Sequence, residues 1–76
     1  MSFEDFLKSA RETDEKEVED YTLEPGEKVV RFQGDVWMLR RADGEYDLIL
    51  GNCEWCGHLR DVAVHLYHWA ISESRI

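Results

Sequence analysis

Both cysteines and all three histidines of this 76-residue chain lie within sixteen residues, from Cys53 to His68. Cys53 and Cys56 form a Cys-x-x-Cys pair, and after eight intervening residues His65 and His68 form a His-x-x-His pair. Thiolate sulfur and imidazole nitrogen are the ligands that structural zinc prefers. A chain of this length has a small core and gains stability from a bound metal. The spacing therefore predicts one structural zinc ion held by these four side chains.

Each pair is spaced so that its two donor atoms reach one ion. A Cys-x-x-Cys turn brings two sulfur atoms together, and Gly57 permits the backbone shape that turns amides toward them. On a helix, His65 and His68 are neighbours on one side, with Cβ atoms about 5–6 Å apart. His58 is the competing ligand if the last helix begins after it. If His58 is helical, about 10 Å of helix axis separates it from His65, and the two cannot share one ion.

This pattern resembles the zinc-finger class in which a hairpin supplies two cysteines and a helix supplies two histidines. The resemblance covers residues 46–70, with Cys53 and Cys56 as the knuckle pair and His65 and His68 as the helical pair. Eight residues separate Cys56 from His65, whereas about twelve separate them in the usual finger. Two residues separate the histidines, whereas about three to five do so in the class. The resemblance implies the zinc chemistry of the class and identifies no DNA-reading member of it.

Other chemistry fits these residues less well. A redox Cys-x-x-Cys at a helix N-terminus carries a reactive thiolate, but the alternating strand–helix pattern of thioredoxin-like proteins is absent from the sequence. Haem attachment requires histidine directly after the second cysteine, where Gly57 stands. A His-Glu-x-x-His motif is absent as well. We therefore expect no enzyme and no catalytic residues.

The elements that must position the zinc ligands follow from hydrophobic periodicity. Apolar residues at helical spacing predict a helix over 3–12. The composition of residues 13–20 does not decide between a continuation of this helix and a mobile segment. Residues 21–24 suit a short extended segment, and Pro25-Gly26 predicts a turn.

Three strand-like apolar runs, 29–32, 36–41 and 46–50, predict an antiparallel meander. Asp43-Gly44 marks the hairpin between the second and third runs. From Leu59 onward the period is helical, and one broad apolar face should pack on the sheet through Leu59, Val62, Ala63, Leu66, Trp69 and Ala70. We predict an α+β fold with an N-terminal helix, a three-stranded antiparallel sheet and a C-terminal helix, joined by a single structural zinc site.

Charge divides the chain at residue 27. Residues 1–27 hold ten acidic and three basic residues, a net charge of -7, whereas residues 28–76 carry only -1. We interpret 1–27 as an acidic N-terminal helix or arm and 28–76 as a zinc-stabilised βββα domain. Such an arm repels phosphate backbones, so the expected partner is a protein with a basic surface and not nucleic acid. The same charge would also keep a small protein in solution.

Several apolar residues are candidates for partner contact. Val64, Tyr67 and Ile71 lie opposite the apolar face of the last helix and must meet the N-terminal helix, a second copy in a homodimer, or a partner. Trp55, between the cysteines, is either an aromatic anchor for a partner or a cap on the sheet.

The function that fits best is a small acidic regulator or inhibitor that acts by protein–protein interaction. One form of it is a phage-type protein that imitates the charge of nucleic acid. The first alternative is a nucleic-acid-binding finger that uses Arg40, Arg41, Arg60 and Arg75. The second is a Cys-x-x-Cys thiol redox protein.

The sequence shows neither a secretory leader nor a run of eighteen apolar residues. We therefore expect a cytoplasmic location and no membrane partner. In that compartment the cysteines are reduced and available to a metal.

Overall fold

The computed structural model describes residues 2–48 and 56–76. Its first element, helix α1 (Phe3–Lys8), begins with a side-chain cap, because the Ser2 hydroxyl accepts the Asp5 N–H at 3.2 Å. Two acidic residues in the first turn, Glu4 and Asp5, complement the positive end of the helix. The prediction of an N-terminal helix is confirmed.

The helix ends earlier than predicted. The Ser9 hydroxyl donates to the Phe6 carbonyl at 2.6 Å and accepts the Gln33 N–H at 2.9 Å. The chain then forms strand β1 (Arg11–Thr13), which pairs antiparallel with β4 (Lys28–Phe32). The predicted extension to residue 12 is wrong because an isolated short helix is only marginally stable, whereas β1 pairs backbone groups along one edge of β4.

The main sheet contains, within the described residues, five antiparallel strands in the order β1, β4, β5 (Val36–Arg40), β6 (Tyr46–Asp47) and β7 (Cys56–Gly57). A separate antiparallel hairpin joins β2 (Glu17–Val18) to β3 (Tyr21–Thr22). The predicted antiparallel α+β class is confirmed, and the predicted count of three strands is wrong. The additional strands are two or three residues long and mostly polar, so they lack the alternation that marks a strand in sequence.

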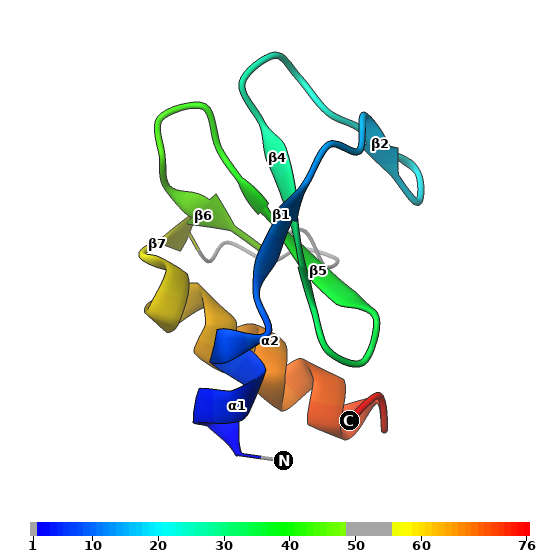
Figure 1. The fold of residues 1–76 in the computed structure, drawn as a ribbon, viewed down its shortest axis with the longest axis vertical. Coiled ribbons are helices and arrows are strands. Elements are labelled where there is room, and N and C mark those ends of the chain that lie inside the picture. Colours follow the sequence, from blue (N-terminus) through cyan, green and yellow to red (C-terminus); the bar gives the residue numbers. More distant parts are fainter. Residues whose placement is uncertain (1, 49–55) are drawn as a thin grey trace.

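Strand β5 buries side chains on both faces of the sheet, because its residues 36–39 are all apolar and successive side chains point to opposite faces. Val36 and Met38 join one apolar cluster, whereas Trp37 and Leu39 join another on the opposite face. The two helices and the β2–β3 hairpin accordingly lie on different sides of the sheet (Figure 1).

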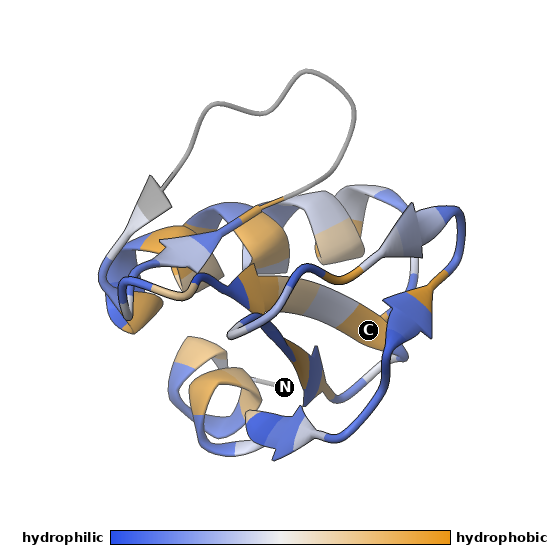
Figure 2. Ribbon diagram, turned by 90° about the horizontal axis from the view of Figure 1, so that it is seen from above, coloured by the Kyte–Doolittle hydropathy of each residue, from blue (hydrophilic) through white to orange (hydrophobic). Residues whose placement is uncertain are grey.

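Both helices pack on the Val36 and Met38 face. Helix α2 (Leu59–Ser72) buries four residues of its predicted apolar face, namely Val62, Ala63, Leu66 and Ala70. From α1, the Phe6 ring stacks on Phe32 with 4.8 Å between centroids. Apolar and hydrophilic residues alternate along both helices, as an amphipathic element on a sheet requires (Figure 2). Within the described residues, neither helix is long and apolar enough to cross a bilayer.

The β2–β3 hairpin covers the opposite face. Val18 is only 4% exposed and packs with Val29, Trp37 and Leu39. The Tyr21 hydroxyl donates to both carboxylate oxygens of Glu27, at 2.9 and 3.1 Å. Burial, followed by this contact with a carboxylate, raises the pKa of Tyr21 to about 12. The acidic segment that follows α1 is therefore part of the folded structure.

The C-terminal residues close over the turn between β4 and β5. The Arg75 amide donates to the Ala70 carbonyl at 2.8 Å, which folds the last residues back beyond α2. Gly34 in the turn has a φ of 82°, and a Cβ there would lie 2.4 Å from Ile76 Cγ2 and 2.7 Å from the Arg75 carbonyl oxygen. This position therefore requires glycine for both its backbone conformation and the close approach of the tail.

Gly34→Ala should destabilise the protein more than Gly44→Ala, its matched control. Gly44 has a φ of 92° but open space around a Cβ, so its replacement imposes backbone strain alone, about 1–2 kcal/mol. At Gly34 the clash with the tail should add about 1 kcal/mol or more. Urea unfolding followed by tryptophan fluorescence measures both variants. Equal losses of unfolding free energy in the two variants would show that the tail does not pack against this turn in solution.

Candidate functional site

Helix α2 carries the predicted histidine pair. His65 is half-buried and His68 is exposed, and both lie within the helix. From Leu59, the start of α2, they lie about 9 and 14 Å along the axis. Residues three apart on a helix are neighbours on one side. The helical placement that the zinc prediction needs for these two residues is confirmed.

Strand β7 places the backbone of Cys56 beside the start of the same helix. Cys56 pairs with Asp47 of β6, and Gly57 pairs with Tyr46. Gly57 has a φ of 144°, a conformation open to glycine and strained for other residues. This conformation lets the chain pass from strand to helix within two residues, and β7 also packs beside α2.

His58 is the N-cap of α2, with extended backbone angles of -73° and 149°. Its carbonyl accepts the Val62 N–H at 3.1 Å, and its side chain is exposed and makes no capping bond. The helix therefore begins after His58, which is the condition under which His58 competes as a ligand. His65 and His68 are neighbours on one side of α2, and His58 remains the alternative ligand.

The described residues do not include all four predicted zinc ligands. Cys53 and Trp55 lie outside the described residues, and of Cys56 only the backbone is described. In the described part of the chain, no three His, Cys, Asp or Glu side chains come together as metal ligands. The four-ligand site therefore stays a prediction.

The outer face of α2 is partly covered by α1. The Tyr67 ring lies 5.5 Å from the Phe3 ring and 5.2 Å from the Phe6 ring, measured between centroids. The expected contacts of the outer face of α2 are the N-terminal helix, a second copy or a partner, and the structure shows contact with the N-terminal helix. Val64 is half-buried, whereas Ile71 is 48% exposed.

Acidic residues of the first 27 positions form ion pairs with bases of the remaining chain. Each of these contacts joins segments far apart in sequence, and the pairs are Glu4–Arg60, Glu12–Arg40 at 3.9 Å, Asp14–Lys28 at 3.3 Å and Glu15–Arg31 at 2.7 Å. Two arginines of the finger hypothesis, Arg40 and Arg60, are thus engaged by carboxylates. The Arg75 guanidinium lies over the Trp69 ring, 5.0 Å from its centroid.

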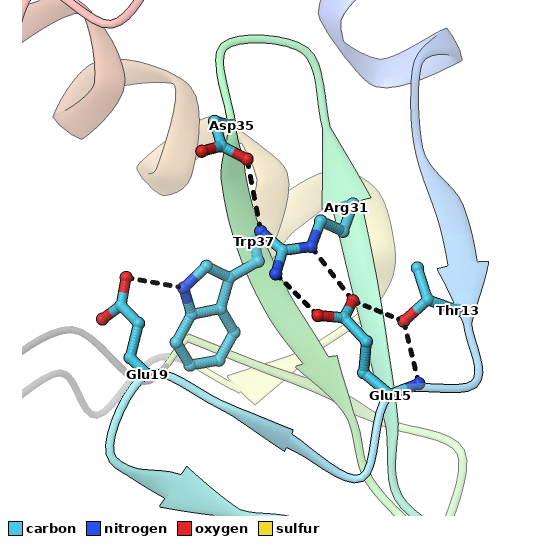
Figure 3. Close-up of polar contacts among 6 residues, drawn as sticks. All are labelled: Thr13, Glu15, Glu19, Arg31, Asp35 and Trp37. Carbon is cyan, nitrogen blue, oxygen red and sulfur yellow. Dashed lines mark hydrogen bonds and ion pairs between the residues drawn. The ribbon is translucent and has the colours of Figure 1, made fainter.

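The Glu15–Arg31 pair is the best organised of these contacts (Figure 3). Arg31 Nη2 donates to Glu15 Oε1 at 2.7 Å, and Arg31 Nε donates to Oε2 at 3.0 Å. The Thr13 hydroxyl adds a third bond, to Oε2 at 2.7 Å. The hydrogen bonds from Arg31, followed by the one from Thr13, lower the pKa of Glu15 to about 2. Sequence analysis missed this pair, although the Val29-x-Arg31 alternation places Arg31 on the hairpin face.

Other carboxylates in and near the β2–β3 hairpin form no ion pair among the described residues. Glu17, Asp20 and Glu24 are exposed, and none has an ion pair among the described residues. Glu19 accepts the Trp37 indole N–H at 3.4 Å and is otherwise exposed. The hairpin therefore carries unneutralised negative charge on a buried apolar support.

Comparisons with protein-family models, with curated proteins and with solved structures return no match to this chain.

Glu15→Gln should flatten the acid dependence of stability. The folded pKa of Glu15 is about 2, against an ordinary value of 4.5, so the unfolded chain binds more protons between these values. The stabilising contribution is complete above about pH 5 and is lost as the pH falls toward 2. Urea unfolding between pH 2 and 7 should show this loss in the wild type and a smaller one in Glu15→Gln. At pH 7 the variant should be about 1 kcal/mol less stable, because the pair is partly exposed to water.

Glu17→Gln is the matched control, because Glu17 is exposed and has no ion pair among the described residues. Its stability should stay within about 0.5 kcal/mol of the wild type. Parallel acid losses in the wild type and Glu15→Gln would contradict the assigned pair.

Proposed function

We propose that this chain is a small acidic zinc-binding regulator or inhibitor that acts by binding a protein with a basic surface. The observation that carries the proposal is a cluster of four exposed carboxylates on and just after the β2–β3 hairpin, none of which forms an ion pair among the described residues: Glu17, Glu19, Asp20 and Glu24. Val18 anchors this hairpin in an apolar cluster on the sheet. The charge is therefore presented in a fixed arrangement, and imitation of nucleic-acid charge is one form of the proposal.

The proposed metal is structural. Two thiolates and two imidazoles form a donor set suited to tetrahedral zinc. The proposed ligands are Cys53, Cys56, His65 and His68. The helical spacing of His65 and His68 supports them as a ligand pair, and Cys56 lies in a strand that packs beside the same helix. When bound, zinc would join β7 and the preceding residues to the outer side of α2. Metal affinity would then contribute directly to folding free energy.

The first experiment is metal analysis by native mass spectrometry. Wild-type protein should carry about one zinc per chain, as expected of a closed structural site. Cys53→Ser and His65→Ala should lose it, whereas His58→Ala should retain it. If His58→Ala loses the zinc and His65→Ala retains it, the ligand is His58 and not His65. A metal-free wild type that stays folded in chelator would contradict the proposal that a zinc ion stabilises this protein.

The second experiment compares a fluorescent hexa-arginine peptide with DNA and RNA as ligands at about 50 mM salt. We expect salt-sensitive binding of the peptide and none of either nucleic acid. The triple variant Glu17→Gln, Asp20→Asn, Glu24→Gln should weaken peptide binding about three- to tenfold, if each lost charge contributes a few tenths of a kcal/mol.

The matched control neutralises three exposed acids on the helices or at a helix end, with Asp5→Asn, Asp61→Asn and Glu73→Gln in one chain. This control removes the same formal charge and should leave peptide affinity closer to that of the wild type. Equal weakening by both triple variants would show that only net charge matters. Salt-sensitive binding of DNA or RNA would instead favour the nucleic-acid-binding finger.

A further inference from the structure

A small hollow of about 100 Å³ lies beside the first half of β5. Its lining comes from five parts of the chain and consists of Glu19, Asp35, Val36, Trp37, Trp69 and Arg75. Within the described residues, β6 pairs with β5 only at Leu39 and Arg40, at the other end of that strand. The hollow therefore lies beside the part of β5 that β6 does not pair with in the described chain.

The lining combines two indole rings with two carboxylates. Tryptophan is the best aromatic acceptor for a cation–π contact. Trp69 already makes one, because the Arg75 guanidinium lies 5.0 Å from its ring centroid. Glu19 and Asp35 are exposed at the same hollow and supply negative charge. A positively charged side chain is the ligand that this combination suits.

Neighbouring contacts hold the two carboxylates in place beside the Trp37 indole (Figure 3). Trp37 is 5% exposed and donates its indole N–H to Glu19 at 3.4 Å. Arg31 Nη1 lies 3.4 Å from Asp35 Oδ1, and the Glu15 carboxylate holds the same guanidinium from the other side. Each carboxylate thus has one contact at 3.4 Å before any ligand arrives, which lowers part of the cost of ordering it on binding.

We infer that this hollow receives one arginine side chain of the basic partner, which displaces the Arg75 guanidinium from Trp69. The inference rests on the proposed function and names a contact through which such a partner is recognised. The cavity is far smaller than a site for a drug-sized molecule. A planar guanidinium can stack on an indole while it donates to carboxylates, as Arg75 and Arg31 separately do here.

The test uses the full chain and two probes. The first probe, N-acetyl-Gly-Arg-Gly amide, is titrated while the indole N–H signals are followed by NMR, with assignment from Trp37→Phe and Trp69→Phe. The signals of Trp37 and Trp69 should shift with the arginine peptide and stay unchanged with its citrulline counterpart, which has no charge. Equal shifts with both peptides, or none with either, would overturn the inference.

The second probe is the hexa-arginine peptide, whose dissociation constant is measured for matched variants. Glu19→Gln keeps an acceptor for Trp37, and Asp35→Asn suits the left-handed φ of 60° at that position. Each should weaken binding about three- to tenfold more than Glu17→Gln, which removes the same charge outside the hollow. Arg75→Ala should tighten binding about two- to fivefold, because the internal competitor is gone.

These outcomes separate the two proposals. If the peptide binds wild type but Glu19→Gln and Asp35→Asn match Glu17→Gln, the hollow is not the contact and the proposed function stands. Weaker binding by Arg75→Ala also overturns the inference, since Arg75 then helps the ligand instead of competing with it. If the wild type binds no arginine peptide at all, both proposals fail.

Discussion

The constraint that governs this structure is the burial of β5 on both of its faces. Val36 and Met38 face the helices, whereas Trp37 and Leu39 face away from them. A strand with apolar side chains on both faces needs apolar cover on two sides. Residues 28–76 cover only one of these sides, with helix α2. The first 27 residues provide the rest, with α1 beside α2 and the β2–β3 hairpin on the opposite face. The most acidic part of the chain is thereby built into the fold.

This arrangement gives the acidic residues two distinct uses. Those on and next to α1 and β1 form ion pairs with bases of the sheet and α2, and the Glu15–Arg31 pair has two hydrogen bonds between its side chains. Those on the hairpin stay exposed and form no ion pair among the described residues. Ion pairs at such half-exposed sites contribute modestly to stability. The hairpin carboxylates add no ion pair to the stability of the described chain, and in the proposed function they bind the basic partner.

The elements with a clear period could be predicted from sequence. β4, β5 and α2 carry sustained apolar patterns, and the turns at Gly34 and Gly44 have the positive φ that their residues suggest. The strands β1 and β7 could not be predicted, because two or three polar or glycine residues carry no period. Their pairing depends on which edges of the sheet are available, and this is a tertiary property. The same limit explains the early end of α1.

Some residues of the candidate sites could likewise be predicted from sequence, and others could not. The spacing of His65 and His68 sufficed to place them together on one side of a helix, whereas the ligand role of Cys53 lies beyond the described residues. The Glu15–Arg31 pair joins residues sixteen positions apart, and no local pattern links them. The hollow between Trp37 and Trp69 gathers residues from the hairpin, a turn, a strand, a helix and the tail. Such a site becomes visible only when the topology is known.

Amide hydrogen exchange of the full chain tests most directly whether the acidic segment is part of the fold. The Leu23 amide donates to the Lys16 carbonyl at 2.9 Å, and β1 pairs along β4. These amides should be protected together with those of β4 and β5, because the same cooperative unit covers both faces. Rapid exchange throughout residues 11–24, with β4 and β5 still protected, would show that these residues form a loose acidic arm outside the fold.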